Sequence, residues 1–121
     1  MQQGTHAYRA VAKEIASPRD LEANLLLKAA ARLQAVRDSW SNDRSDLNDA
    51  LLYNRKLWTI FLDSAMSADN PLPTEIRQNV ANLGVFVMKQ TMSVISDPQP
   101  EILAALININ RELAAGLRGQ G

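Results

Sequence analysis

The chain has 121 residues, no cysteine, a single histidine and a net charge of zero, with 13 basic and 13 acidic residues. This length indicates one domain, and the absence of cysteine excludes disulfides and thiolate metal sites. Zero net charge argues against a nucleic-acid-binding protein, because such proteins usually carry a basic excess. We therefore expect no direct contact with nucleic acid.

The sequence also argues against a membrane or secreted protein. No apolar run approaches the roughly 20 residues that a membrane-spanning helix needs. Residues 1–6 lack the basic and then apolar pattern of a secretory signal. We expect a cytoplasmic protein that does not insert into membranes, with residues 1–121 forming a single helical domain. Its ends, about 1–7 and 118–121, are expected to be flexible.

Apolar residues recur every three or four positions, which predicts an all-α fold, a small helical bundle of about five helices. A first short helix is expected over about residues 8–15. Ser17 and Pro18 begin the second, since serine can cap a helix and proline suits its first position. Its apolar stripe continues to Trp40. Asp46 is then the expected cap of the third helix.

The third helix carries apolar residues from Leu47 to Ala65 and ends before the prolines at 71 and 73, which cannot both lie inside a helix. The fourth runs from about Thr74 to Ile95. Prolines at 98 and 100 precede the fifth, whose apolar face extends from about 102 to 117.

Few residues in the chain are suited to catalysis. One histidine, His6, without a supporting pattern does not predict a Ser-His-Asp site. Asp43, Asp46 and Asp49 are the best carboxylate cluster, and we interpret them as capping the third helix and favouring its dipole rather than binding a metal. The glycines lack the spacing of a phosphate-binding loop. We expect no enzyme activity, no cofactor and no metal.

Three features of the third and fourth helices are unusual. Asn54–Phe61 places an amide and a tryptophan on one apolar face, which indicates either the core or a partner site. The fourth helix has two apolar faces, so it is either central in the bundle or supplies a groove, for which Met88 and Met92 are adaptable. Gly84 inside this helix costs about 1 kcal/mol relative to alanine, which predicts that another helix packs closely there.

Several segments resemble the FlaF family of flagellar biosynthesis regulators from alphaproteobacteria. The similarity spans about residues 8–95, and its most specific elements are Asn-Arg-x-Leu-Trp at 54–58 and Asn-Pro-Leu-Pro at 70–73. The matching segments are Tyr8, 17–23, 50–61, 70–73, Arg77 and 82–87.

The resemblance implies a cytoplasmic protein needed for flagellin production and flagellum assembly. It implies a dedicated flagellin chaperone that keeps the subunit competent for type III export, with a functional link to the regulator FlbT. The alternative is a post-transcriptional regulator that acts on flagellin mRNA directly or through an RNA-binding partner. Salt dependence separates the two, because RNA binding weakens steeply with added salt.

Under the chaperone hypothesis, the partner is a terminal helical segment of flagellin. The expected contact residues come from the third and fourth helices: Leu51, Asn54, Arg55, Trp58, Arg77, Phe86 and Val87. The sequence leaves open whether Asn54–Phe61 faces the partner or the core.

Overall fold

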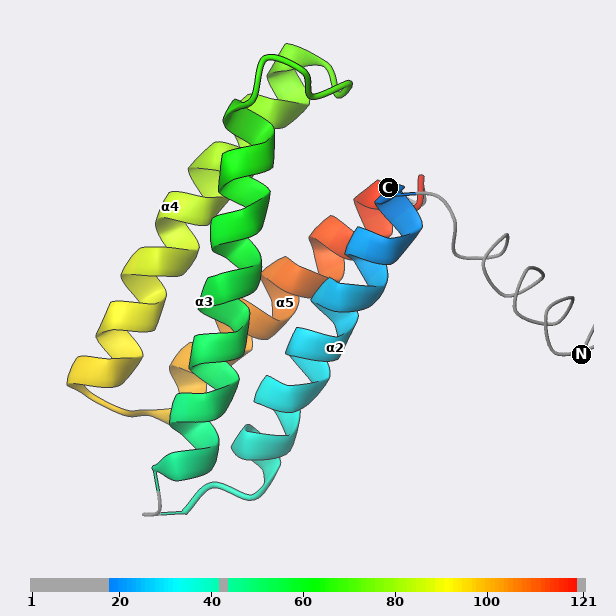
Figure 1. Cartoon of the computed structure of the whole chain (residues 1–121). Helices are drawn as coiled ribbons and strands as arrows, with labels where there is room; N and C mark the ends of the chain where they lie inside the picture. The colour runs from blue at the N-terminus through cyan, green and yellow to red at the C-terminus, as the bar shows by residue number, and fades with distance from the viewer. Residues whose placement is uncertain (1–17, 42–43, 120–121) are drawn as a thin grey trace, which may run out of the picture.

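The computed structural model describes residues 18–41 and 44–119. Within these ranges the chain forms four helices: α2 (Pro18–Asp38), α3 (Ser45–Met66), α4 (Thr74–Ser96) and α5 (Pro100–Leu117). The described residues contain no strand, so the all-α prediction is confirmed. Figure 1 shows the helices as an up-and-down bundle, in which each helix runs opposite to the one before it.

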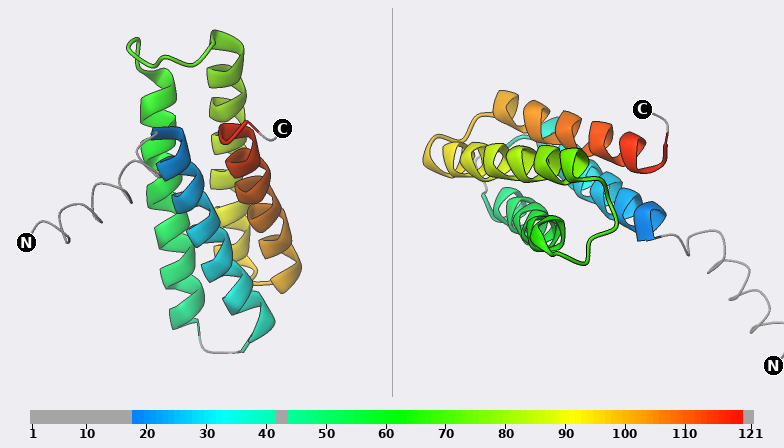
Figure 2. Two further views of the ribbon diagram at one scale, coloured as in Figure 1. Left: turned by 90° about the vertical axis from the view of Figure 1, so that its right-hand side faces the viewer. Right: turned by 90° about the horizontal axis from the view of Figure 1, so that it is seen from above.

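The helices are arranged as two pairs. α2 packs on α5, and α3 packs on α4; α2 also contacts α3, and α4 contacts α5, which closes a ring of four. Figures 1 and 2 show that the α3–α4 hairpin extends beyond the start of α2 and the end of α5. The two pairs also diverge toward this end of the molecule.

The core follows from the three-and-four spacing of apolar residues, which places them on one face of each helix. α2 buries mostly small residues, so α5 can approach it closely, whereas α3 contributes the largest side chain, Trp58. The ring of Phe61 meets Trp58 edge to face, with ring centroids 5.8 Å apart. The fully buried large apolar side chains are Leu26, Leu33, Leu51, Trp58, Val87, Val94, Leu103, Leu106 and Ile107.

The helix boundaries agree with the sequence prediction except at the turn between α2 and α3. The expected first helix, residues 8–15, lies outside the described residues, as does the expected cap Ser17. α2 ends at Asp38, so Trp40 lies beyond it, where the guanidinium of Arg44 stacks 5.3 Å from the ring. Asp46 was expected to cap α3 but lies in its first turn, because the helix already begins at Ser45.

Side-chain hydrogen bonds hold the loop between α3 and α4. Asn70 donates through Nδ2 to the backbone oxygen of Ser64 at 2.9 Å, and its Oδ1 accepts from the amide of Leu72 at 2.9 Å. Arg77 on α4 donates through Nη1 to the backbone oxygen of Ser67 at 3.0 Å. These side-chain bonds supplement the backbone bonds that the carbonyl groups of Ser64 and Ser67 accept from the amides of Ser67 and Asn70 at the end of α3.

Gly84 is the point of closest approach between α3 and α4. A Cβ built on Gly84 would lie 2.4 Å from Cδ2 and 2.7 Å from Cγ of Leu62. The predicted close packing at this glycine is therefore confirmed, and the neighbour belongs to the same chain. Any larger residue would push the two helices apart or force Leu62 into another rotamer.

The first prediction concerns this approach. Gly84→Ala should lower the free energy of unfolding by about 1 kcal/mol, because overpacking costs more than the helix propensity of alanine returns. Gly116→Ala is the matched control, since nothing lies within 4 Å of a Cβ there, and it should be neutral or stabilising. Urea unfolding of both variants measures the difference, and a stabilised Gly84→Ala would contradict the packing described.

Candidate functional site

A buried hydrogen-bond network joins α3, α5 and α2. We call it the Asn110 network. Trp58 donates through Nε1 to Oδ1 of Asn110 at 2.9 Å, and Asn110 donates through Nδ2 to Oδ1 of Asn54 at 2.7 Å. A longer bond, 3.4 Å, runs from the same Nδ2 to the backbone oxygen of Leu26. Asn54, Trp58 and Asn110 are each 0% exposed.

The sequence left open whether Asn54–Phe61 faces the core or a partner. In the structure Asn54, Trp58 and Phe61 all face the core. Of the seven expected contact residues, four are buried in the bundle: Leu51, Asn54, Trp58 and Val87. In this folded state they present no surface to a partner, because their stripes are covered by α2 and α5. The spacing of apolar residues in the sequence predicts that this face of the third helix is buried. It cannot tell whether other helices of the same chain or a partner protein bury it.

The other three expected contact residues lie in different places. Arg55 is exposed on α3, Phe86 is exposed on α4, and Arg77 is half-buried beneath the loop it holds. Phe86 and Arg55 do not share a face, since Phe86 lies on the side of α4 away from the α3–α4 seam. The structure therefore does not bring the seven residues together as one surface.

A different apolar surface is exposed along α4. The α4 stripe consists of Ala81, Val85, Met88, Met92 and Ile95. Val85, Met92 and Ile95 are 52%, 59% and 51% exposed, whereas the neighbouring stripe through Val80, Gly84, Val87, Thr91 and Val94 is buried. The second apolar face predicted for this helix therefore lies on the surface, and α4 is not a central helix.

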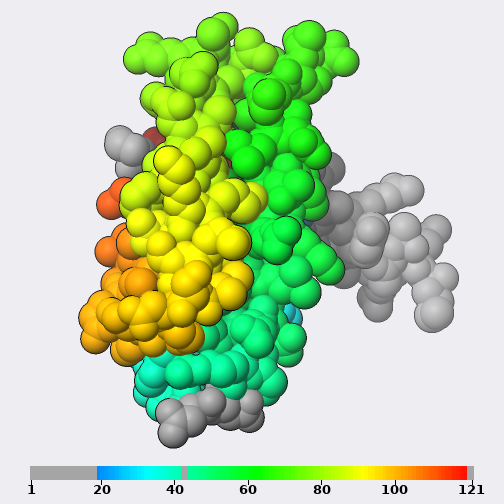
Figure 3. Space-filling model, turned by 90° about the vertical axis from the view of Figure 1, so that its left-hand side faces the viewer, coloured from blue at the N-terminus to red at the C-terminus, as the bar shows by residue number. Residues whose placement is uncertain are grey.

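The α4 stripe is continued by α3. Leu62 packs against Gly84, and ten residues further along each antiparallel helix, about 15 Å, Leu52 comes level with Val94 and Ile95. At the other end, Met66 and Ala81 line the same groove, a hollow of about 250 Å³ that also includes Gln78 and Arg77. Figure 3 shows α3 and α4 side by side along this face.

Sequence reasoning missed the α3 side of this surface. Leu52 and Met66 are exposed, yet the positions between them on that face of the helix include Thr59 and Asp63, so no apolar run is visible. Only the position of α4, fixed by Gly84, makes Leu52 and Met66 part of one surface. The signal available in the sequence was that two apolar residues, Leu52 and Met66, lie at the two ends of a helix face that also carries polar residues.

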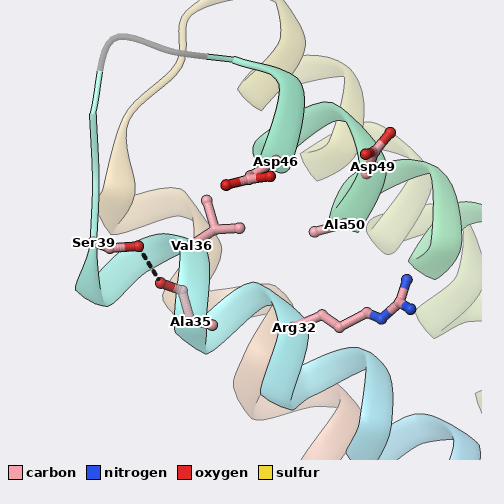
Figure 4. Close-up of a pocket in the computed structure, with 7 residues that line it drawn as sticks. All are labelled: Arg32, Ala35, Val36, Ser39, Asp46, Asp49 and Ala50. Carbon is pink, nitrogen blue, oxygen red and sulfur yellow. Dashed lines mark hydrogen bonds between the residues drawn. The ribbon is translucent and has the colours of Figure 1, made fainter.

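A second hollow lies between α2 and α3, with a volume of about 350 Å³. Figure 4 shows the residues that line it, with Asp46 and Asp49 on α3 and Arg32 on α2. Arg32 lies over the ring of Tyr53, 4.5 Å from its centroid. In the described part of the chain no three histidine, cysteine or acidic residues are placed to hold a metal ion, and Asp43 lies outside it.

A third, smaller hollow opens where the two helix pairs diverge. We call it the wedge cleft. It has a volume of about 20 Å³ and is lined by Glu22, Phe61, Ser64, Ala65, Asn70, Leu72, Val80, Leu113 and Leu117. Glu22 is the only ionisable residue among these. Burial raises the pKa of its carboxyl above the ordinary value of 4.5, and the nearby Arg19 offsets part of this effect.

The fold and these surfaces define a small all-α protein whose exposed apolar surface is concentrated on one helical hairpin. No helix in residues 18–41 or 44–119 combines the length and apolar character needed to cross a membrane. The family model described as flagellar protein FlaF matches residues 4–117. The chain therefore belongs to the FlaF family of flagellar proteins. Comparison with curated proteins and with solved structures finds no match.

The second prediction tests the Asn110 network. Asn110→Ala should lower the free energy of unfolding by about 3 kcal/mol, because it leaves the indole N–H of Trp58 and the Oδ1 of Asn54 buried without partners. Asn108→Ala, an exposed asparagine on the same helix, should change it by less than about 0.5 kcal/mol. Equal effects of the two substitutions in urea unfolding would show that the network does not stabilise the bundle.

The third prediction concerns Glu22. Its folded-state pKa is raised, so the folded protein binds the proton more tightly than the unfolded chain and loses stability as pH rises through that pKa. Glu22→Gln should therefore stabilise the protein at neutral pH, and the gain should disappear as pH falls below 4.5. Glu112→Gln, at an exposed position on α5, is the control. A gain at neutral pH that persists in acid would contradict this explanation.

Proposed function

We propose that this FlaF-family protein is a flagellin-binding chaperone and that the α4 stripe, with the adjoining flank of α3, holds a helical segment of flagellin. The observation that carries the proposal is the exposure of Val85, Met92 and Ile95 on a helix whose neighbouring face is already buried. A monomeric protein rarely leaves such a row of large apolar side chains exposed unless it contacts something.

The dimensions of the surface suit a helix as the partner. From Ala81 to Ile95 the stripe extends about 21 Å, at 1.5 Å per residue. An amphipathic helix of about four turns would cover it and would place its apolar face in the seam between α3 and α4. Met88 and Met92 adapt their shape to the side chains they meet, which suits a partner that also has to be released.

The charges beside the stripe favour a defined orientation of the partner. Arg55 and Lys56 are exposed on α3, and Lys89 is exposed on α4. These three cations, together with the exposed Asp63 on the same face of α3, flank an apolar centre, as polar residues do at the rims of protein interfaces. An amphipathic helix with acidic residues on its borders would be complementary, whereas RNA would find an apolar centre and a chain with no net positive charge.

This binding explains how a small protein without a nucleotide site could assist flagellin. Flagellin subunits associate through terminal amphipathic segments. Covering one such segment prevents premature polymerisation and leaves the subunit ready for export. The export apparatus needs only to bind flagellin more favourably than this surface does. A regulatory role follows if the flagellin-free and flagellin-bound forms differ in their binding to a regulator such as FlbT.

The fourth prediction tests this surface. Val85→Glu and Met92→Glu should each weaken flagellin binding at least about tenfold, because a charge would be buried against an apolar helix face. The circular dichroism and melting temperature should be retained, since both side chains are already exposed. Calorimetric titration with intact flagellin, and with flagellin lacking each terminal helical segment, measures the effect.

Ile60→Glu is the matched control, because Ile60 is an exposed apolar residue on the flank of α3 that faces α2. It should leave flagellin binding unchanged. Failure of the unmodified protein to bind intact flagellin at micromolar concentration would overturn the chaperone proposal. Equal loss in all three variants would show that the α4 stripe is not the specific site.

A further inference from the structure

The line along which α2 and α3 meet carries exposed side chains of its own, on the flank of α3 away from the α4 stripe. Arg32 on α2 lies over the ring of Tyr53 on α3, which marks the register of these antiparallel helices. Seven residues from this contact, about 10 Å along each helix, Leu25 comes level with Ile60. Leu21 is 49% exposed, Ile60 is 63% exposed, and Leu25 is half-buried. These three side chains form an open apolar zone.

Two cations share one aromatic ring in the next zone. The Cζ atom of Arg32 lies 4.5 Å from the ring centroid of Tyr53, and the Nζ atom of Lys28 lies 5.9 Å from it. Both cations are exposed, and neither forms an ion pair or a hydrogen bond with a described residue. Like charges four residues apart on a helix repel each other, and a guanidinium held over a ring keeps its N–H donors free for a carboxylate. This basic zone therefore favours an acidic ligand.

An acidic zone follows at the other end of the same line. Asp46 and Asp49 are exposed on α3 and line the hollow of about 350 Å³ that Arg32 also lines (Figure 4). The register places Asp46 level with Ser39, seven residues beyond Arg32. From Leu21 to Ser39, about 27 Å at 1.5 Å per residue, the surface therefore changes from apolar to basic to acidic. We call these three zones together the α2–α3 face.

We propose that the α2–α3 face is a second protein-binding surface and that its occupant is an α-helix of another protein. One side of this helix carries apolar, then acidic, then basic residues at intervals of about seven residues, or two turns, so that they meet the three zones in order. A helix bound in the reverse direction would place its basic residues on the apolar zone, so the pattern also fixes the direction. The proposal goes beyond flagellin binding and does not depend on it.

The combination of charge and apolar area favours such a helix over other occupants. RNA would neutralise Lys28 and Arg32, but its phosphates would then meet the carboxylates of Asp46 and Asp49 two turns away. A wholly apolar helix would remove the two cations from water without giving them partners, which is costly. A helix with the stated pattern pairs both charged zones, and such pairing adds specificity and speeds association.

Two synthetic peptides of identical composition test the proposal with the full chain. The first has about 21 residues and carries leucine on one side of its first two turns, glutamate in the next two and lysine in the last two. The second exchanges the glutamates and the lysines. In a nuclear magnetic resonance titration the first peptide should shift the amide signals of Leu25, Arg32 and Ile60 but not that of Met92 on the α4 stripe. The second should bind at least about tenfold more weakly, because its lysines meet the basic zone.

Charge reversal in the protein shows which residues bind. Lys28→Glu combined with Arg32→Glu should weaken binding of the first peptide at least about tenfold and remove the preference for it over the second. Lys89→Glu combined with Arg111→Glu makes the same change of charge at exposed positions on α4 and α5, and should leave binding unchanged. Unchanged circular dichroism in both double variants shows that the helices remain folded.

Two single substitutions separate this surface from the proposed flagellin site. Ile60→Glu should weaken binding of the first peptide, because it places a carboxylate in the apolar zone, and should leave flagellin binding unchanged. Val85→Glu should do the reverse. An unaltered peptide affinity in Ile60→Glu would contradict the α2–α3 face alone, whereas an unaltered flagellin affinity in Val85→Glu would contradict the α4 stripe alone.

Three further results would overturn the proposal. The first is the absence of shifts at Arg32 and Ile60 with the first peptide at about 1 mM, a concentration that reveals even weak binding. The second is equal affinity for the two peptides, which would show that the charges are not recognised. The third is a dimer of the unmodified protein in sedimentation that Ile60→Glu dissociates, which would make a second copy the occupant.

Discussion

One side chain, that of Asn110, fixes the arrangement of this bundle. Its amide accepts a hydrogen bond from Trp58, donates one to Asn54 and reaches the backbone of Leu26, so it connects α5 to α3 and α2. Apolar side chains are interchangeable along a helix face, and helices packed by them alone can slide by a turn. An amide in the core cannot, because a shift would leave buried polar groups without partners. The need to keep these hydrogen bonds therefore decides which stripe of α3 is buried.

The network also carries a cost. The Nδ2 atom of Asn54 is buried and has no hydrogen-bond partner among the described residues. Such a group typically costs about 1–3 kcal/mol. Two well-aligned hydrogen bonds and the packing of Trp58 against Phe61 offset it. Polar residues in this core therefore contribute more to the specificity of the arrangement than to its total stability.

The positions of α2 to α5 could be predicted from the sequence, because apolar spacing and paired prolines mark each helix. Gly84 was also informative, since a glycine inside a helix implies close approach. The roles of Asn54 and Trp58 were not predictable, because their partner Asn110 lies more than 50 residues away and only folding brings it near. A usable signal existed: Asn54 and Asn110 each interrupt an otherwise apolar stripe.

The extension of the α3–α4 hairpin beyond the other two helices has a consequence for local dynamics. Residues near the tip are supported by each other and by the hydrogen bonds of Asn70 and Arg77, whereas residues of α3 beside Asn110 are also packed against α5 and α2. Regions with fewer buried neighbours open at a lower free energy than the whole molecule. The tip can therefore fray and reclose as a unit while the centre stays intact. Exchange of backbone amide protons should accordingly form a gradient along α3, fastest at Met66 and slowest near Asn54.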